Sequence, residues 1–283
     1  MVPTRIACVA MGLSAAAVAH AQLISGFEQP DFFGSAGGSS FVGVDGWYQP
    51  VATGIEHGLY TYSGNTLGIS QNPVGGNQFI AGRSGGTPLF ARAQRGFDFG
   101  SGGSFTIAYD MAANFDGAGD SALNLSSFSL QSDGAAAGSF KSFIALNNFV
   151  DLTDPSAGFK AEFNVFDSTG VATNNLSPGA AWENLDTNRW YRQIIDIDFA
   201  TNRVLSVTIV DLTSGMSSTA SPDGWFMTGG AGSMLALPED FRFFVGGSDG
   251  NIMGWDNILV VPAPASLLAF AGVAGFAGVR RRR

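Results

Sequence analysis

Hydrophobic and polar residues alternate along most of this chain, with a period of two. The stretch 104–111 places Phe105, Ile107 and Tyr109 on one face. The same alternation runs through 159–166, where aromatic and aliphatic residues take turns with Lys, Glu and Asn. Alternation of this kind, bounded by Gly, Asn, Asp and Ser, is typical of β-strands with one buried face. Further strands are predicted at 189–199, 204–212, 241–247 and 253–261.

The connections between these stretches indicate an antiparallel arrangement. Residues 200–203 (Ala-Thr-Asn-Arg) form a turn between two alternating runs and predict the clearest hairpin of the chain. Helical periodicity is weak, and the body offers at most one helical turn, at 232–240. About a dozen short strands without βαβ alternation predict an all-β fold, a single antiparallel two-sheet sandwich of the jelly-roll kind over 22–260.

The N-terminus carries the pattern of an export signal. Arg5 is the only charge before an apolar run at 6–18, which is followed by Ala19-His20-Ala21. A positive start, a short apolar stretch and small residues before the cleavage point predict a secretory signal peptide over 1–21. The Sec export machinery and signal peptidase are therefore expected partners, and a buried N-terminal helix is the alternative.

The C-terminus has a second hydrophobic segment with a different layout. Pro262 and Pro264 precede fourteen uncharged residues at 266–279, and Arg280, Arg281, Arg282 and Arg283 end the chain. As a helix this segment would span about 21 Å, which is short of the roughly 30 Å hydrocarbon core. The arginines are expected to stay on the cytoplasmic side. The pattern predicts a short, weakly held transmembrane helix, and a buried helix with a basic end is the alternative.

A proline motif, a short hydrophobic helix and an arginine cluster resemble the PEP-CTERM sorting signal of Gram-negative bacteria. The usual Pro-Glu-Pro is here the variant formed by Val261, Pro262, Ala263, Pro264, Ala265 and Ser266. The resemblance covers 261–283 and implies processing by an exosortase-type membrane protease. It implies a protein that is transiently anchored in the inner membrane and then released to the cell surface or the medium. The resemblance concerns destination and says nothing of activity.

Charge and cysteine content exclude several classes of partner and chemistry. Between the two terminal segments lie nine basic and 23 acidic residues, a net charge of −14. Such a body is a poor partner for nucleic acid or an anionic membrane surface. The one cysteine, Cys8, lies in the predicted signal peptide. The exported domain would therefore have no disulfide, no thiol nucleophile and no cysteine ligand for a metal.

A second resemblance concerns the first and last strands of the body. A Phe-Glu pair at the start and Asp-Asn-Ile at the end are similar to extracellular jelly rolls, such as carbohydrate-binding modules and laminin-G-like or concanavalin-like domains. In several of these a Glu and an Asp on neighbouring strands share a structural calcium ion, which implies Glu28 and Asp256 as ligands here. Two adjacent carboxylates do repel unless a cation neutralises them. The alternative is that Glu28 caps a turn and Asp256 accepts from backbone amides.

Residues that commonly carry catalysis are sparse. His57 is the only histidine of the mature chain, and we interpret it as a surface loop residue. The pattern G-x-S-x-G occurs at 82–86 and 246–250, but neither copy leads into a helix as a nucleophile elbow requires. A pair of acids flanking a cleft would suffice for a glycosidase, and Glu162 and Glu183 are available for one. Nothing in the sequence singles them out.

Exposed aromatic rings are the expected means of sugar binding, because pyranose rings stack on them. Trp182 and Trp225 are the candidates, since polar turn residues surround both, and packing over an end of the sandwich is their alternative role. Tyr60 and Tyr62 are weaker candidates. The other three tryptophans of the chain are interpreted as core: Trp47, Trp190 and Trp255.

Three functions remain open from the sequence. The favoured one is a non-catalytic, exported β-sandwich that binds a glycan, an extracellular polysaccharide, or the matrix. The second is an extracellular polysaccharide-degrading enzyme on the same fold. The third is a purely structural coat component without a small ligand.

Overall fold

The computed structural model describes residues 23–49, 57–85, 91–100, 102–115, 124–131, 142–150, 158–232, 237–246 and 250–262. About half of these residues lie in strands, and the one described helix is the 3₁₀ turn η2 (Ala180–Trp182). No described helix has the length and apolar character to cross a bilayer. The predicted signal peptide at 1–21 and the predicted helix at 266–279 lie outside the described residues.

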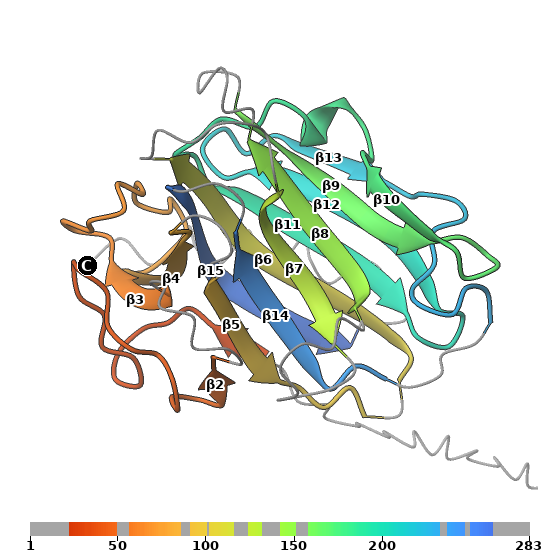
Figure 1. Ribbon diagram of the computed structural model, residues 1–283, viewed down its shortest axis with the longest axis horizontal. Helices are drawn as coiled ribbons and strands as arrows, with labels where there is room; N and C mark the ends of the chain where they lie inside the picture. The colour runs from red at the N-terminus through yellow and green to blue at the C-terminus, as the bar shows by residue number, and fades with distance from the viewer. Residues whose placement is uncertain are drawn as a thin grey trace, which may run out of the picture.

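The strands form two antiparallel sheets that pack face to face (Figure 1). Sheet 1 has the order β13 (Ser217–Ala220), β12 (Arg203–Asp211), β11 (Tyr191–Asp198), β6 (Ser104–Phe115), β15 (Asn251–Pro262), β4 (Gln78–Arg83) and β3 (His57–Thr61), and β1 (Leu23–Ser25) also pairs with β15. Sheet 2 has the order β10 (Ala172–Leu176), β9 (Phe159–Phe166), β8 (Ser142–Val150), β7 (Asn124–Gln131), β14 (Asp240–Val245), β5 (Ala91–Gly96) and β2 (Trp47–Tyr48). The predicted all-β sandwich is confirmed.

The alternation of buried and exposed side chains within the strands agrees with the prediction from the sequence. In β9 and β11 every second side chain is buried, beginning with Phe159 and with Tyr191. The predicted hairpin is confirmed, because β11 pairs with β12 through the turn at 200–203, where Asn202 takes a left-handed backbone conformation. Asn tolerates this conformation better than most residues.

Aromatic side chains from both sheets meet in the core. The ring of Tyr109 on β6 lies 4.9 Å from that of Phe128 on β7 and 5.5 Å from that of Phe243 on β14. Phe243 in turn lies 5.1 Å from Trp255 on β15. Edge-to-face and offset contacts of this kind add to the stabilisation from burial. The core is therefore continuous across the interface between the sheets.

A second hydrophobic layer covers part of the outward face of sheet 1. Residues 62–77 fold over β4, β15 and β6, and the ring of Tyr62 stacks on Phe79 at 4.6 Å. The carbonyl of Leu67 accepts a 2.7 Å hydrogen bond from Asn114 on β6. The remaining members of this layer include Ile69, Tyr60 and Trp190. Side chains that point outward from this part of sheet 1 are consequently removed from water.

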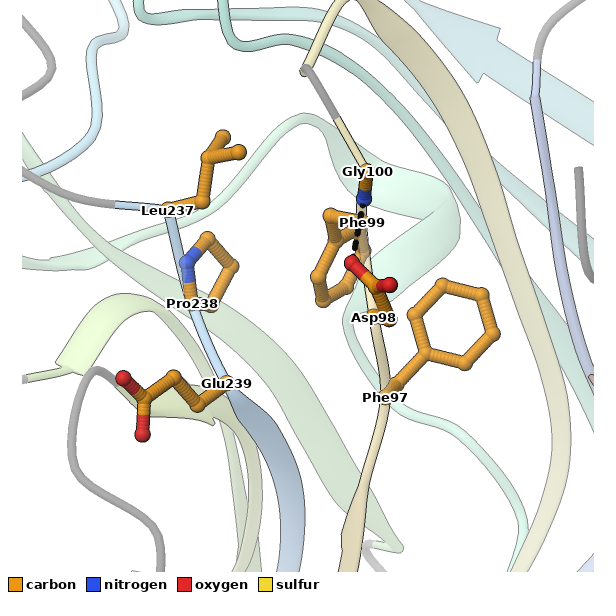
Figure 2. A pocket seen from close by; sticks show the side chains of 7 residues that line it. All are labelled: Phe97, Asp98, Phe99, Gly100, Leu237, Pro238 and Glu239. Carbon is orange, nitrogen blue, oxygen red and sulfur yellow. Dashed lines mark hydrogen bonds between the residues drawn. The ribbon is translucent and has the colours of Figure 1, made fainter.

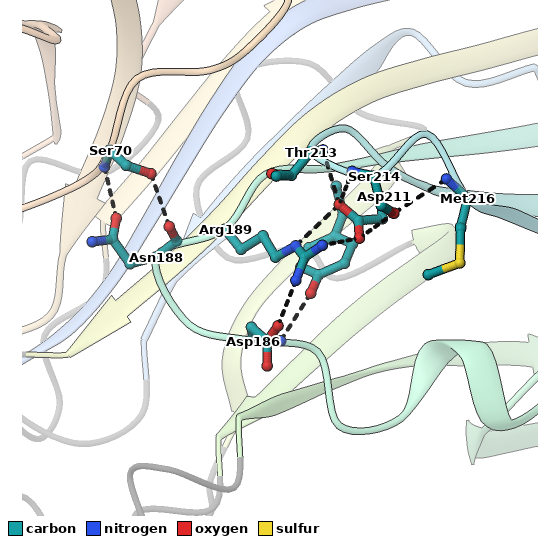
Figure 3. Close-up of polar contacts among 9 residues, drawn as sticks. Ser70, Asp186, Asn188, Arg189, Asp211, Thr213, Ser214 and Met216 are labelled. Atoms are coloured by element: carbon teal, nitrogen blue, oxygen red, sulfur yellow. Dashed lines mark hydrogen bonds and ion pairs between the residues drawn. The ribbon is translucent and has the colours of Figure 1, made fainter.

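One end of the sandwich is fixed by an arginine that bridges two loops (Figure 3). Arg189 donates from Nη1 to Asp186 at 2.9 Å and from Nε to Asp211 at 3.0 Å, and its Nη2 also pairs with Asp211. Next to it, Ser70 donates from its amide and hydroxyl to Asn188. These bonds tie the start of β11 to the end of β12 and to the layer over sheet 1.

The last described strand includes the first two residues of the proposed sorting motif. Val261 and Pro262 belong to β15, where they pair with Thr106 and Phe105 of β6. The rest of the proposed sorting motif and the arginine cluster, 263–283, lies outside the described residues. At the other end Leu23 pairs with Val260, so the two ends of the body lie side by side.

The helical turn expected at 232–240 is only partly testable. Residues 237–239 are described and are not helical, and Asp240 already belongs to β14. Residues 233–236 lie outside the described part of the chain.

Candidate functional site

Two buried aspartates face each other on the outward side of sheet 1. Asp110 on β6 and Asp256 on β15 are directly paired in the strand register, and both side chains are completely buried. The layer at 62–77 covers them, so water cannot screen their mutual repulsion. Each carboxylate therefore has to be neutralised or hydrogen-bonded by its protein surroundings.

Asp110 is neutralised by an arginine. Arg192 on β11 donates from Nε and Nη2 to the two carboxylate oxygens at 2.6 and 3.0 Å. The side-chain amides of Asn72 and Asn257 add bonds of 2.9 and 2.7 Å to Oδ2. A bidentate arginine pair with two further donors is a strong arrangement for a buried carboxylate. Both oxygens of Asp110 are thus hydrogen-bonded.

Asp256 has only neutral donors. The hydroxyl of Tyr62 donates to Oδ2 at 2.8 Å, and the amide of Asn257 donates to Oδ1 at 2.8 Å. Burial raises the pKa of Asp256 to about 8, and the charges of Asp110 and Glu28 act in the same direction. Without a cation this carboxyl group holds a proton up to neutral pH.

Glu28 lies beside the same loop as Asp256. Its Oε1 accepts from the amides of Asn77 and Gln78 at 2.7 and 3.0 Å. A side chain on Gly75 would overlap the Asp256 carboxylate, and one on Gly76 would overlap that of Glu28. The structure therefore brings the two predicted calcium ligands against consecutive glycines. It also shows the contacts of the alternative reading, since both residues accept from backbone amides.

The donors around Glu28 and Asp256 suit a hard cation. Carboxylate, amide and backbone oxygens are the ligands that calcium prefers. Asn72 turns its amide nitrogen to Asp256 at 3.4 Å, while its oxygen accepts from the amide of Val74. Among the described residues no group of three or more acidic, histidine or cysteine side chains is arranged to hold a metal. A calcium ion here would have to combine these two carboxylates with amide or backbone oxygens.

The structure corrects the premise on which Trp182 was selected for sugar binding. Its side chain is only 1% exposed, and its Nε1 donates to Gln193 in the core at 3.1 Å. The short turn η2 directs the ring inward, as in the alternative in which this loop closes an end of the sandwich. A buried ring offers no face to a pyranose.

Trp225 is half-buried. Its ring lies 5.4 Å from that of Phe163 and packs against the core, with part of its surface exposed. Tyr60 and Tyr62 are buried. The expectation that the other three tryptophans belong to the core is confirmed: Trp47, Trp190 and Trp255 are each 1% exposed.

The outward side of sheet 2 carries a compact patch of polar side chains that we call the polar face. Three neighbouring strands, β7, β14 and β5, each contribute residues at every second position, and β2 adds one tyrosine. The register aligns Ser129 with Arg242 and Arg242 with Gln94 across the three strands. The members of the polar face are Tyr48, Arg92, Gln94, Ser127, Ser129, Gln131, Asp240, Arg242 and Phe244.

Contacts within the polar face hold its side chains in place. Arg242 donates from Nε to Gln94 Oε1 at 2.6 Å. The guanidinium of Arg92 lies over the ring of Phe244, with its carbon 5.9 Å from the ring centroid. Gln131 donates to the hydroxyl of Ser129 at 2.5 Å. Side chains fixed in this way lose little conformational freedom when they bind a ligand.

Asp240 is the acid of the polar face. The hydroxyl of Tyr48 donates to its Oδ1 at 3.0 Å, while Oδ2 is buried and makes no hydrogen bond. Burial raises the pKa of Asp240, although the bond from Tyr48 acts in the opposite direction. Burial also raises the pKa of Tyr48, whose hydroxyl therefore stays protonated. A buried acceptor without a donor is costly and points to a missing partner.

An open pocket adjoins the polar face where β5 ends and β14 begins (Figure 2). It encloses about 560 Å³ and is lined by Phe97, Asp98, Phe99, Gly100, Leu237, Pro238 and Glu239. Asp98 accepts from the amide of Gly100 at 2.7 Å, and Glu239 points away from it. Both acids line this pocket, and their carboxyl groups point in different directions in Figure 2.

Sequence reasoning did not identify the polar face. Its signal was present: Arg242 interrupts the aromatic run 241–244, and Arg92 and Gln94 alternate with small residues. Alternation shows that such side chains point away from the core. It does not show that three strands distant in sequence become neighbours, because that follows from the sheet order alone.

Neither a protein-family model nor a curated protein sequence matches this chain. Several solved structures have a similar overall arrangement. The T. cruzi calreticulin globular domain covers 82% of this chain and 90% of its own, at 9% identity and a TM-score of 0.48. Alginate lyase vAL-1 from Chlorella virus covers 78% of this chain and 95% of its own, at 13% identity and a TM-score of 0.45. Lectin II from Ulex europaeus covers 77% of this chain and 93% of its own, at 12% identity and a TM-score of 0.40. None of these likenesses is close enough to identify a shared function.

Proposed function

We propose that this chain is an exported, non-catalytic β-sandwich that binds an extracellular glycan on the polar face of sheet 2. The observation that carries this proposal is the concentration of arginine, amide, hydroxyl and carboxylate groups at adjacent positions in the middle of a sheet. Such groups form the paired hydrogen bonds that sugar hydroxyls need. Six of the nine members of the polar face are at most 5% exposed, so a glycan would reach it through the half-buried Tyr48, Ser127 and Phe244.

Aromatic surface supports the same proposal. Tyr48 and Phe244 are half-buried at two sides of the polar face, and each presents part of a ring. Pyranose rings have apolar C–H faces that pack on aromatic rings, while their hydroxyls take polar partners nearby. The polar face offers both kinds of contact within a few residues.

A glycan array tests the proposal directly. The full-length chain is expected to bind at least one class of polysaccharide, and Phe244→Ala is expected to weaken that binding about tenfold, the equivalent of about 1.4 kcal/mol. Phe33→Ala is the matched control, because Phe33 is an exposed phenylalanine (65%) outside the polar face. Absence of binding to every glycan would favour a structural coat component. Release of reducing sugar from a polysaccharide panel would favour the enzyme.

We also propose export and sorting by the two terminal segments. Signal peptidase would cleave before Gln22, and an exosortase-type protease would process the motif at 261–266 after the arginine cluster has stopped transfer. Mass spectrometry of protein recovered from outside the cell is expected to find Gln22 as the first residue and no arginine cluster. An intact C-terminus on that protein would contradict the sorting proposal.

A structural calcium ion between Glu28 and Asp256 is the third part of the proposal. Two carboxylates against Gly75 and Gly76, one of them with a raised pKa, would be stabilised by a divalent cation. At a calcium concentration 100 times the dissociation constant, binding would add about 2.7 kcal/mol to the free energy of unfolding.

Melting with and without chelator tests the calcium site. The wild-type midpoint is expected to fall when calcium is removed, and Glu28→Gln is expected to abolish the difference. Glu183→Gln, on the connection after η2, is the control that should keep it. A wild-type midpoint that is indifferent to chelator would rule the site out.

A further inference from the structure

We infer that two copies of this chain associate through the outer edge of β13 and extend sheet 1 across a two-fold axis. This inference goes beyond the proposed function, because it concerns the other sheet and a protein partner. It assigns one edge strand, Ser217–Ala220, and one kind of partner, a second copy of this chain.

Among the described strands each sheet ends in two edge strands, and three of these four edges are protected. On β3, Leu59 exchanges both main-chain hydrogen bonds with Ser39, at 2.8 and 2.9 Å. β2 has only two residues, and the amide and carbonyl of Trp47 bond to residues 43–44 of its own turn. An irregularity of register interrupts β10 after Thr173. Covering segments, short strands and bulges are the usual means of protecting a sheet edge.

β13 shows none of these protections in the described part of the chain. It pairs with β12 in an unbroken register, from Val210 opposite Ser217 to Val207 opposite Ala220. Its sequence, Ser-Ser-Thr-Ala, has no charged residue and no proline. No described strand pairs with its other side. Such an edge is a template for a further strand.

The main-chain groups of two residues of β13 point away from β12. The amide of Asp211 donates to the carbonyl of Met216 at 2.8 Å, so Met216 directs its carbonyl towards β12. Successive residues direct these groups to alternate sides of a strand, so Ser217 and Thr219 turn theirs to the open side. Both residues are exposed. The edge therefore offers the amides and carbonyls of two residues to a partner.

These groups match a second copy of themselves. If two β13 strands run antiparallel about an axis at Ser218, Ser217 of each copy lies opposite Thr219 of the other, and each pair exchanges both of its hydrogen bonds. The same register places Met216, which is 70% exposed, opposite Ala220 of the second copy. A contact of this kind uses the same surface on both copies and closes at two, so a dimer is expected and not a fibre.

Charge favours self-association at this place. Residues 212–222 carry no charge, although the body as a whole has a net charge of −14. The acids at the two ends of this segment are paired, Asp211 with Arg189 and Asp223 with Arg203. Two copies would therefore meet with little repulsion at this edge.

The dimer would have a defined geometry. A two-fold axis between antiparallel neighbours is perpendicular to the sheet, so sheet 2 of both copies would lie on the same side of the joined sheet 1. The two polar faces would therefore point in the same direction. This consequence alone rests on the proposed function, since one dimer would then hold a glycan at two places.

Sedimentation of the full-length chain at increasing concentration is the primary test. The apparent mass is expected to rise from one chain towards two. Thr219→Pro is expected to keep it at one chain, because proline has no amide to donate and the amide that is lost points away from β12. Thr219→Lys should act in the same direction through repulsion between like charges. Thr173→Lys on β10, which is also exposed, is the matched control and should associate as the wild type does.

Two results would overturn the inference. One is a wild-type chain that stays a monomer at every concentration. The other is equal association of the wild type and both Thr219 variants, once melting curves have established that the variants are folded. All these chains share the same terminal segments, so a difference between them reports on the edge. No glycan is used, so either result would leave the proposed function intact.

A cross-link tests the register. In a chain with Cys8→Ser, Ser218→Cys would place two thiols opposite each other in a non-hydrogen-bonded pair, whose Cα atoms lie about 4.5 Å apart. This separation permits a disulfide. A covalent dimer is expected on incubation with oxidised glutathione, and Thr173→Cys on β10 is the control that should give none. Absence of the covalent dimer in Ser218→Cys, or equal yields from the two variants, would overturn the assignment of this edge.

Discussion

The outward faces of the two sheets both bury charged side chains, and they satisfy them differently. On sheet 1, the completely buried Asp110 has the partly exposed Arg192 and two asparagine amides as donors. On sheet 2, Asp240 has one donor, Tyr48, and a second oxygen with none. Burial of charge is common to both faces, whereas the carboxylate of Asp240 keeps one oxygen without a hydrogen bond and that of Asp110 does not. We therefore associate stability with the first face and binding with the second.

The largest expected effect is on sheet 1, where Arg192→Met leaves Asp110 without its counter-ion. Breaking a buried ion pair from one side costs about 3 kcal/mol of unfolding free energy. Chemical denaturation measures the loss. Arg203→Met is the control, because the exposed pair of Arg203 with Asp223 is worth less than about 1 kcal/mol. Equal losses in the two variants would show that Asp110 does not depend on Arg192.

A smaller loss of unfolding free energy is expected from Gly75→Ala. The new methyl group would overlap the carboxylate of Asp256 and the side chain of Asn72, both fixed under the layer over sheet 1. Overpacking of this kind costs about 2 kcal/mol. Gly37→Ala is the matched control, since a methyl group there meets no atom within 4 Å. If thermal melting gives both variants the same midpoint, the contact between this loop and Asp256 is looser than the structure shows.

On sheet 2, Asp240→Asn is expected to increase the free energy of unfolding. The amide keeps an acceptor for Tyr48 and removes a buried carboxylate whose second oxygen has no donor. Exchanges at functional positions commonly stabilise a protein by about 1 kcal/mol while they weaken its function. The unfolding free energy measured by denaturation should thus rise, while the affinity for glycan falls. The same change at Asp110 should destabilise, and parallel behaviour of the two variants would remove the distinction between the faces.

The smallest effect is expected from Asp256→Asn at pH 5, because the carboxyl group already holds a proton there. The free energy of unfolding should fall by less than about 1 kcal/mol. The folded-state pKa, about 8, lies above the ordinary value of 3.8, so the folded chain binds the extra proton. With chelator present, the contribution of this proton to the unfolding free energy of the wild type is consequently complete below pH 4. It declines as the pH rises towards 8. Denaturation across this range should show the decline in the wild type and not in the variant. A wild-type curve that rises with pH would contradict a raised pKa.

Strand positions could be predicted because alternation is a local property. Phe159, Ala161 and Phe163 identify their buried face without knowledge of any partner strand. Sheet order could not be predicted, since it depends on which distant strands meet, and neither could the layer at 62–77, whose sequence resembles an exposed loop. Trp182 shows the same limit: polar neighbours indicated exposure, but the turn η2 directs its ring into the core.

Glu28 and Asp256 were identified from a resemblance, and Glu28 lies three residues after β1, held by the amides of Asn77 and Gln78. Asp110, Asn72 and Arg192 were not identified, because each comes from a different segment and none forms a motif by itself. The polar face was missed for the same reason. In both places the interacting polar residues come from segments that are far apart in sequence.

The pairing of Leu23 with Val260 means that the described chain enters and leaves the sandwich at the same end of sheet 1, because β1 and β15 run antiparallel. Under the proposed export and sorting, both proteases would therefore cut near that end. Trimming there would leave the opposite end of the strands untouched.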